Sequence, residues 1–181
     1  SQVIKPQLDN NEAGVPITIK SEELPLEFTY PSGEGAYTLV EPPVATTTEG
    51  LKKVYLIMNT EEYLDFQSDG DEESPLSVSV FILETPEVPE DSEDAGRISR
   101  LQSWAEQYSE YTSYDKISSE LEIIEVDGVN GLFYRTGGEY KQEVYVIDYR
   151  GTTYVFTGQF EKEGDDIHQM FVGLISTVVF N

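Results

Sequence analysis

Short segments with an apolar residue at every second position most constrain the fold of this chain. From Leu24 to Tyr30 the alternate residues are apolar, and a segment at 36–40 follows a glycine-containing turn, so we expect these two strands to pair. Segments 53–58 (KVYLIM) and 78–83 (VSVFIL) are apolar on both faces, as central strands covered on each side must be. The pattern predicts a sheet whose middle needs cover on both faces.

The second half of the chain repeats the strand pattern. It predicts strands at 120–126, 131–136, 143–149 and 152–158. The joints between them are turn sequences, namely Asp127-Gly128, Gly137-Gly138 and Arg150-Gly151, and the last fits a two-residue hairpin loop. These four strands are therefore expected to form an antiparallel meander.

Two segments carry apolar residues at helical spacing and could supply the cover. One is 97–108 (RISRLQSWAEQY); the other is 165–180 (DDIHQMFVGLISTVVF), with Asp165 or Asp166 as N-cap. Helices separated from a run of strands indicate the α+β class. We expect an antiparallel β-sheet with amphipathic helices packed on both faces, an α/β/α sandwich.

Composition divides the chain into a leader and one domain. Residues 1–22 are polar and broken by Pro and Gly, so we interpret them as an N-terminal tether in which 17–19 could add an edge strand. Residues 23–181 are expected to form a single domain. Residues 84–96, with two prolines and six acids, are interpreted as a solvated connection; a mobile acidic loop that meets a partner is the alternative.

The charge and the composition disfavour several classes of partner and site. With 35 Asp and Glu against 11 Lys and Arg, the net charge is −24, which disfavours nucleic acid. The lack of cysteine removes disulfides, thiolate nucleophiles and Cys-based metal sites. The first residues, SQVIKP, lack Met, so we expect a trimmed or mature chain that reaches a membrane only through an anchor preceding residue 1.

The stretch DFQSDGDEES, at 65–74, looks like a calcium loop. With Asp65 in the first position of an EF-hand register, the twelfth position, which requires a bidentate Glu, is Leu76. We therefore interpret the stretch as an acidic connector, preceded by about one helical turn in TEEYLDF. A weak cation site at Asp69, Asp71 and Glu73, with calcium as the candidate ion, is the testable remainder; no other cofactor is expected.

Few other residues suggest chemistry. His168 is the single histidine, no G-x-S-x-G elbow or phosphate-binding glycine loop is present, and we interpret it as a surface residue. Trp104 lies on the apolar stripe of its helix and is expected in the core. Arg135 and Arg150 could bind an anion; we expect them instead to pair with neighbouring carboxylates. No catalytic residue is assigned.

Five segments together resemble the PsbP-like superfamily, which includes an extrinsic subunit of plant photosystem II and a nuclear-import factor that binds the GTPase Ran. They are LEFTYPSGEG, ESPLSVSVFI, LQSWAEQY, IIEVDGVNGLFY and IHQMFVGLISTVVF. The resemblance covers residues 24–181 and is closest to uncharacterised bacterial exported or lipoprotein-type members. It implies an antiparallel sheet with helices on both faces, and binding without catalysis.

These observations lead to two functional hypotheses. The first is a non-catalytic binding or interaction module of the bacterial cell envelope, a monomer outside the cytoplasm that binds a protein partner or a small ligand. The second is a carboxylate-based hydrolase of carbohydrate or peptide, with calcium as an optional assisting ion. Such a hydrolase would require an open cleft with two facing acids, at least one of which has a raised pKa.

Overall fold

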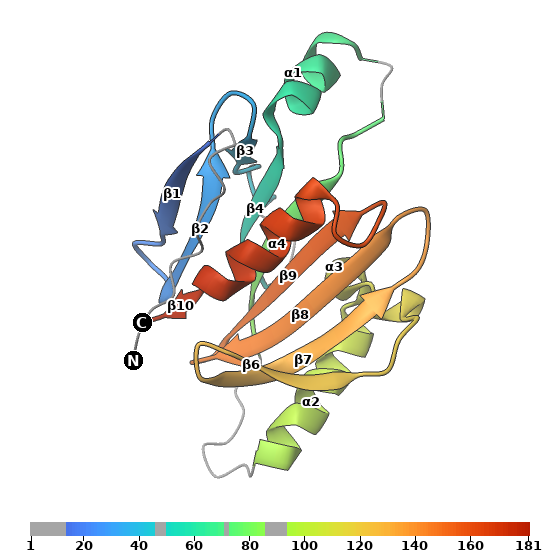
Figure 1. The fold of residues 1–181 in the computed structure, drawn as a ribbon. Coiled ribbons are helices and arrows are strands. Elements are labelled where there is room, and N and C mark those ends of the chain that lie inside the picture. The colour runs from blue at the N-terminus through green and yellow to red at the C-terminus, as the bar shows by residue number, and fades with distance from the viewer. Residues whose placement is uncertain (1–13, 46–49, 71–72, 86–93) are drawn as a thin grey trace.

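The computed structural model describes residues 14–45, 50–70, 73–85 and 94–181, and within them the strands form one mixed sheet (Figure 1). The strand order is β1-β2-β3-β4-β5-β9-β8-β7-β6, with β10 pairing to β2. The strands are β1 Val15–Lys20, β2 Leu26–Ser32, β3 Tyr37–Val40, β4 Leu51–Asn59, β5 Ser77–Glu84, β6 Glu122–Val126, β7 Val129–Thr136, β8 Lys141–Tyr149, β9 Thr152–Phe160 and β10 Val179–Phe180. The helices are α1 Thr60–Ser68, α2 Asp94–Gln107, α3 Ser109–Thr112, the 3₁₀ turn η1 Tyr114–Lys116 and α4 Asp166–Thr177.

The antiparallel pairing of β5 with β9 joins the two halves of the sheet. Its register runs from Val78 opposite Gly158 to Glu84 opposite Thr152. Every residue of β9 except Gln159 is buried. The two central segments that were predicted to be apolar on both faces are β4 and β5, and β5 has buried residues on both of its faces. The middle of the sheet is therefore also the middle of the core.

Two apolar clusters pack against β9. The α4-side core contains Leu26, Phe28, Ile57, Val80, Phe156, Phe171 and Leu174 among others. The α2-side core contains Leu101, Trp104, Ala105, Leu132, Val144 and Val155 among others. Because neighbouring residues of a strand point to opposite faces, Val155 and Phe156 place the two cores on opposite sides of β9. Trp104 is 7% exposed, which confirms its predicted place in the core.

The turn chemistry of the meander is confirmed. Asp127 and Gly128 both have positive φ, as do Arg150 and Gly151, and each pair forms the two-residue loop of a hairpin. Two consecutive positive φ angles are what the type I′ loop requires, and its twist matches that of the flanking strands. All four predicted strands of this half are present, with bounds that differ by two residues or fewer, as β6 to β9.

Two predictions about the first strands need correction: that residues 24–30 pair with residues 36–40, and that the whole sheet is antiparallel. The sheet is mixed. Tyr37–Val40, the strand β3, pairs antiparallel with β4 and touches β2 through a single parallel pair, Ser32 with Tyr37. The turn between them has positive φ at Gly33 and Gly35, and it offsets the chain sideways without reversing it. Tyr37 consequently arrives beside Ser32 with the same strand direction.

The last predicted helix is too long. Asp165 is its N-cap, as expected, and its carboxylate accepts the His168 N–H at 3.0 Å. The helix α4 ends at Thr177, whereas residues 178–180 were predicted to be helical. Val179 and Phe180 form β10 against β2, and Phe180 N–H donates to Asp127 Oδ2 at 2.8 Å. Strand pairing and this side-chain acceptor together outweigh the helical spacing of the apolar residues.

The acidic segments fall partly outside the described residues. The connector after β4 is helical as far as Ser68, longer than the single turn expected, because Asn59 caps α1 by accepting the Glu62 N–H at 3.1 Å. Of the predicted loop 84–96, residues 86–93 lie outside the described residues and 94–96 begin α2. In the leader, residues 1–13 lie outside them, and the edge strand expected at 17–19 is confirmed as the longer β1. The domain boundary at residue 22 stays a prediction.

Among the described residues, none of the helices combines the length and the apolar character needed to cross a membrane.

The approach of α4 to β9 depends on Gly158. A Cβ atom at this position would lie 2.4 Å from the ring of Phe171, which is fully buried. We expect Gly158→Ala to lower the free energy of unfolding by about 3 kcal/mol, the upper range for overpacking a core. Thermal unfolding followed by circular dichroism would measure the loss.

Gly173→Ala is the matched control. Gly173 lies within α4, and a Cβ there meets no atom within 4 Å, so alanine is expected to stabilise by about 0.5–1 kcal/mol through its helix propensity. Equal effects of the two substitutions would contradict the close packing of α4 on β9.

Candidate functional site

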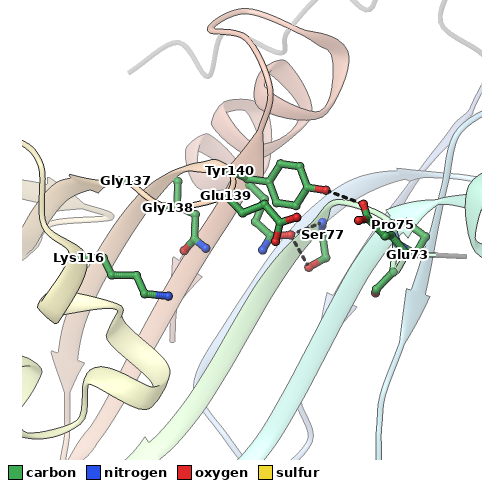
Figure 2. A pocket seen from close by; sticks show the side chains of 11 residues that line it. Glu73, Pro75, Ser77, Lys116, Gly137, Gly138, Glu139 and Tyr140 are labelled. Carbon is green, nitrogen blue, oxygen red and sulfur yellow. Dashed lines mark hydrogen bonds between the residues drawn. The ribbon is translucent and has the colours of Figure 1, made fainter.

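A groove of about 440 Å³ opens at one end of the sheet (Figure 2). It is lined by Glu73, Ser74, Pro75, Ser77, Lys116, Gly137, Gly138, Glu139, Tyr140, Gln142 and Gln159. These residues come from the entry into β5, from η1, from the turn between β7 and β8, and from the ends of β8 and β9. The volume lies within the range of small-ligand sites, roughly 300–1,000 Å³.

A transverse row of polar side chains crosses this end of the sheet; Ser77, Gln142 and Gln159 of this row form the floor of the groove, and Thr136 lines the adjoining hollow. Thr136 pairs with Gln142, and Gln142 pairs with Gln159 across β7, β8 and β9. Gln159 Oε1 accepts the Ser77 N–H at 3.1 Å and its hydroxyl at 3.4 Å, which extends the row to β5. Because directly paired residues share a face, the four side chains lie on the same face of the sheet. We call Thr136, Gln142, Gln159 and Ser77 the polar row. It lies on the face of the α2-side core.

The two glutamines present complementary groups. Because Ser77 donates to Gln159 Oε1, the Nε2 of Gln159 is left as a donor. Gln142 Oε1 is buried and has no hydrogen-bond partner among the described residues. Leaving a buried acceptor unpaired costs about 1–3 kcal/mol, so a ligand that donates to this oxygen would gain that energy.

The turn between β7 and β8 holds Lys116 beside the floor. Gly137 N–H donates to the Lys116 carbonyl oxygen at 2.9 Å, which fixes η1 against the turn. A Cβ on Gly138 would lie 3.9 Å from Lys116 Cδ, so the lysine side chain extends alongside this glycine. Gly138 has a φ of 138°, which residues with a side chain rarely adopt. The Lys116 ammonium makes no ion pair within the part of the chain that the structure describes.

A carboxylate, Glu73, lies at the opposite end of the groove (Figure 2). The Tyr140 hydroxyl donates to Glu73 Oε2 at 3.2 Å, which connects the turn between β7 and β8 to the entry into β5. Glu139 lies between Tyr140 and Gly138, while Figure 2 shows Lys116 and Glu73 at opposite ends. The groove therefore has the Lys116 ammonium at one end and the Glu73 carboxylate at the other, with Glu139 between them (Figure 2).

A second hollow of about 310 Å³ adjoins the groove and shares Gly137 and Gln142 with it. Arg135, Lys141 and Glu163 contribute its charged groups, and Thr136, which is 2% exposed, lines it. The Thr136 hydroxyl has no hydrogen-bond partner among the described residues.

The prediction that His168 lies on the surface is wrong. Its side chain is buried, and its ring stacks on Phe160 with 4.2 Å between the ring centroids. Nδ1 accepts the Gly164 N–H at 2.8 Å, and Nε2 contacts Oε1 of the buried Glu143. Its position among the acids at the start of the helix predicted exposure. Instead, the turn before α4 covers the His168 ring, and Glu143 of β8 supplies a polar partner inside the protein.

These contacts set the state of the histidine. Since Nδ1 accepts a hydrogen bond, the proton of a neutral ring resides on Nε2, which then donates to the Glu143 carboxylate. Both ring nitrogens are thus engaged within the fold. His168 has a structural role and is not placed to act as a general base on a ligand in the groove.

The two arginines behave differently. Arg135 donates through Nε to Glu143 Oε2 at 3.1 Å and through Nη2 to Glu163 Oε1 at 3.4 Å, which confirms the expected pairing with carboxylates. Arg150 lies over the ring of Tyr149, 5.0 Å from its centroid, and donates to the Asn181 carbonyl at 3.4 Å. Those contacts differ from the carboxylate pairing predicted for Arg150, because the hairpin loop places it beside the C-terminal residue.

The weak cation site predicted at Asp69, Asp71 and Glu73 stays a prediction. Asp69 caps the C-terminal end of α1, and Glu73 accepts the Tyr140 hydroxyl, whereas Asp71 lies outside the described residues. Among the residues that are described, none of the clusters of three or more acids or histidines has metal-binding geometry. The helix through Ser68 also removes the extended loop that an EF-hand register starting at Asp65 would need.

A half-buried acid, Asp148, lies at the far end of β8 from the groove. Desolvation raises the pKa of the Asp148 carboxyl, although Arg97, whose Nη1 lies 2.8 Å from Asp148 Oδ1, acts in the opposite direction. Asp148 pairs with Thr153 at one end of β8, whereas Gln142 pairs with Gln159 at the other end, where the groove lies. The acid with the raised pKa is therefore part of a structural ion pair and does not line the groove.

The comparisons with known proteins identify the fold and no family. No family model and no curated protein matches the chain. The fold is similar to the solution structure of cyanobacterial PsbP (CyanoP) from Synechocystis sp. PCC 6803, with a TM-score of 0.57 and 16% identity over 93% of this chain and 94% of that chain. A crystal structure from Bacteroides thetaiotaomicron has a TM-score of 0.46 and 10% identity, covering 87% of this chain and 45% of that chain. The chain thus has an α+β, PsbP-like fold.

The pairing of Arg135 with Glu143 can be tested by substitution. The Glu143 side chain is 6% exposed, so Arg135→Met leaves a buried carboxylate with His168 as its remaining partner. We expect a loss of about 2 kcal/mol in the free energy of unfolding, as for a hydrogen bond to a charged group and less than for a fully buried ion pair, because Arg135 itself is half exposed. Urea unfolding at neutral pH would measure it.

Arg150→Met removes the same charge from a hairpin loop and should change stability by less than about 0.5 kcal/mol. Similar losses in the two variants would show that Glu143 does not depend on Arg135.

Proposed function

We propose that the protein is a non-catalytic binding module of the bacterial cell envelope that holds a small polar ligand in the groove at the end of the sheet. The observation that carries this proposal is the polar row, where Gln159 offers a donor and Gln142 an unpaired buried acceptor on the floor of an open groove. Groups of this kind fix the orientation of a ligand without supplying a reaction.

The arrangement of the residues that could support catalysis favours binding. The chain has no cysteine, and its single histidine is bonded at both ring nitrogens inside the fold. A serine or cysteine nucleophile activated by histidine is therefore unsupported. The PsbP-like fold is consistent with this proposal.

The proposed location rests on the leader and the composition. The leader is polar, cysteine is absent, and the PsbP-like resemblance is closest to exported bacterial proteins. We propose that the protein acts outside the cytoplasm as a monomer, held to the membrane through an anchor that precedes residue 1.

A carboxylate-based hydrolase is the second candidate, because Glu73 and Glu139 line the same groove. The Glu73 carboxylate already accepts the Tyr140 hydroxyl, which gives it a structural partner. A hydrolase would convert its ligand, whereas a binding module would return it unchanged.

Nuclear magnetic resonance can test the binding site. A ¹⁵N-labelled chain would be titrated separately with N-acetylglucosamine, alanyl-alanine and inorganic phosphate at millimolar concentration. We expect at least one probe to shift the amide signals of Gly138 and Tyr140 at the groove, and the probe to remain intact. Shifts confined to other surfaces, or none with any probe, would overturn the proposal; appearance of free alanine would instead favour the hydrolase.

Cell fractionation can test the location. When expressed in a bacterial host with its natural N-terminus, the protein should be recovered with the membrane or the extracytoplasmic fraction. Recovery with the cytosolic fraction would contradict the proposed location, but it would not bear on the proposal that the groove binds a ligand.

A further inference from the structure

We infer that the groove selects a short peptide with two free termini, whose carboxylate lies at Lys116 and whose ammonium lies at Glu73. This inference rests on the proposed binding function and adds the chemical class of the ligand. It derives from the distribution of charge along the groove and from the pair of amide side chains between the charges.

Lys116 marks the end that would receive an anion. Its side chain extends beside Gly138, and its ammonium has no ion pair among the described residues. Arg135 and Lys141 line the adjoining hollow, which shares Gly137 with the groove. Arg135 is already paired with Glu143 and Glu163, so in a chain with a net charge of −24 the site for a carboxylate rests on Lys116.

Glu73 marks the end that would receive a cation. Figure 2 shows Glu73 across the groove from Lys116, with the Tyr140 ring and Glu139 between the two. Tyr140 donates to Glu73 Oε2, so this carboxylate is held toward the groove and retains a second oxygen for a ligand ammonium. An ammonium has three donors and suits such a position.

Between the charges, the floor matches a peptide group. Gln159 Nε2 is available as a donor to a carbonyl, and Gln142 Oε1 is an acceptor without a partner among the described residues. A peptide unit carries one acceptor and one donor on its two edges. A neutral sugar could use these amides, but it would leave both charged ends unused, which is why the peptide is favoured.

Exposed charge pairs set the expected affinity. Lys116, Glu73 and Glu139 are all exposed, so each contact with a ligand terminus should be worth no more than about 1 kcal/mol, or about fivefold in Kd. Binding should therefore be weak, in the millimolar range, and should weaken as salt is added. The selectivity for free termini is therefore measured as the difference in Kd between capped and uncapped ligands.

The test uses four alanyl-alanine ligands and the ¹⁵N-labelled full chain. The ligands are the free dipeptide, its N-acetyl form, its C-terminal amide, and the form capped at both ends. We expect each cap to raise Kd about fivefold, and both caps together to raise it at least tenfold. The signals that shift should be the amides of Gly138 and Tyr140.

Two substitutions assign the ends. Lys116→Gln should abolish the difference between the acid and the amide at the C-terminus, while the penalty for N-acetylation persists. Glu73→Gln should reduce the penalty for N-acetylation, while the preference for the free acid persists. Lys162→Gln and Glu84→Gln change the same charges at exposed positions outside the groove and should leave both preferences intact.

The outcomes separate the inference from the proposal beneath it. If N-acetylglucosamine or phosphate shifts the groove amides and no dipeptide does, the binding function stands and the peptide inference falls. Equal Kd values for the free and doubly capped dipeptides would also overturn it, because the charged ends would then play no part. If none of the probes shifts the groove, both the inference and the proposed function fail.

Discussion

The antiparallel pairing of β5 with β9 is the constraint on which the rest of the molecule depends. It is the strand pairing that connects the strands from β1 to β5 with the meander, and it runs through both apolar cores. The same register decides where the polar groups lie. Because Val78 faces Gly158, Ser77 and Gln159 are neighbours at the end of the pair, and the groove begins where the apolar register stops.

The predicted elements were recovered where local chemistry determines them. Strand alternation, the Asp127-Gly128 and Arg150-Gly151 loops and the Asp165 cap each depend on residues a few positions apart. The errors occur where a distant partner decides. Phe180 leaves the helical pattern because β2 and Asp127 offer it hydrogen bonds, and β3 joins β4 although β2 is nearer in sequence.

The candidate site was missed for the same physical reason. Its members, Ser77, Thr136, Gln142 and Gln159, are ordinary polar residues near strand ends, and no spacing along the chain relates them. They become a row only through the registers of β5, β9, β8 and β7. A search for polar residues at aligned strand ends could have found them after the sheet order was known, whereas motif searches directed attention to Asp69, Asp71 and Glu73.

His168 illustrates how a polar residue can be misread from its neighbours in sequence. Asp165 and Asp166 suggest a solvated helix start, yet the ring lies inside, between Phe160 and the Glu143 carboxylate. Arg135 balances that carboxylate from the outside and also borders the hollow beside the groove. The buried acid in β8 thus holds Arg135 of β7 in an ion pair beside the hollow, so the charge at the groove itself is left to Lys116, Glu73 and Glu139.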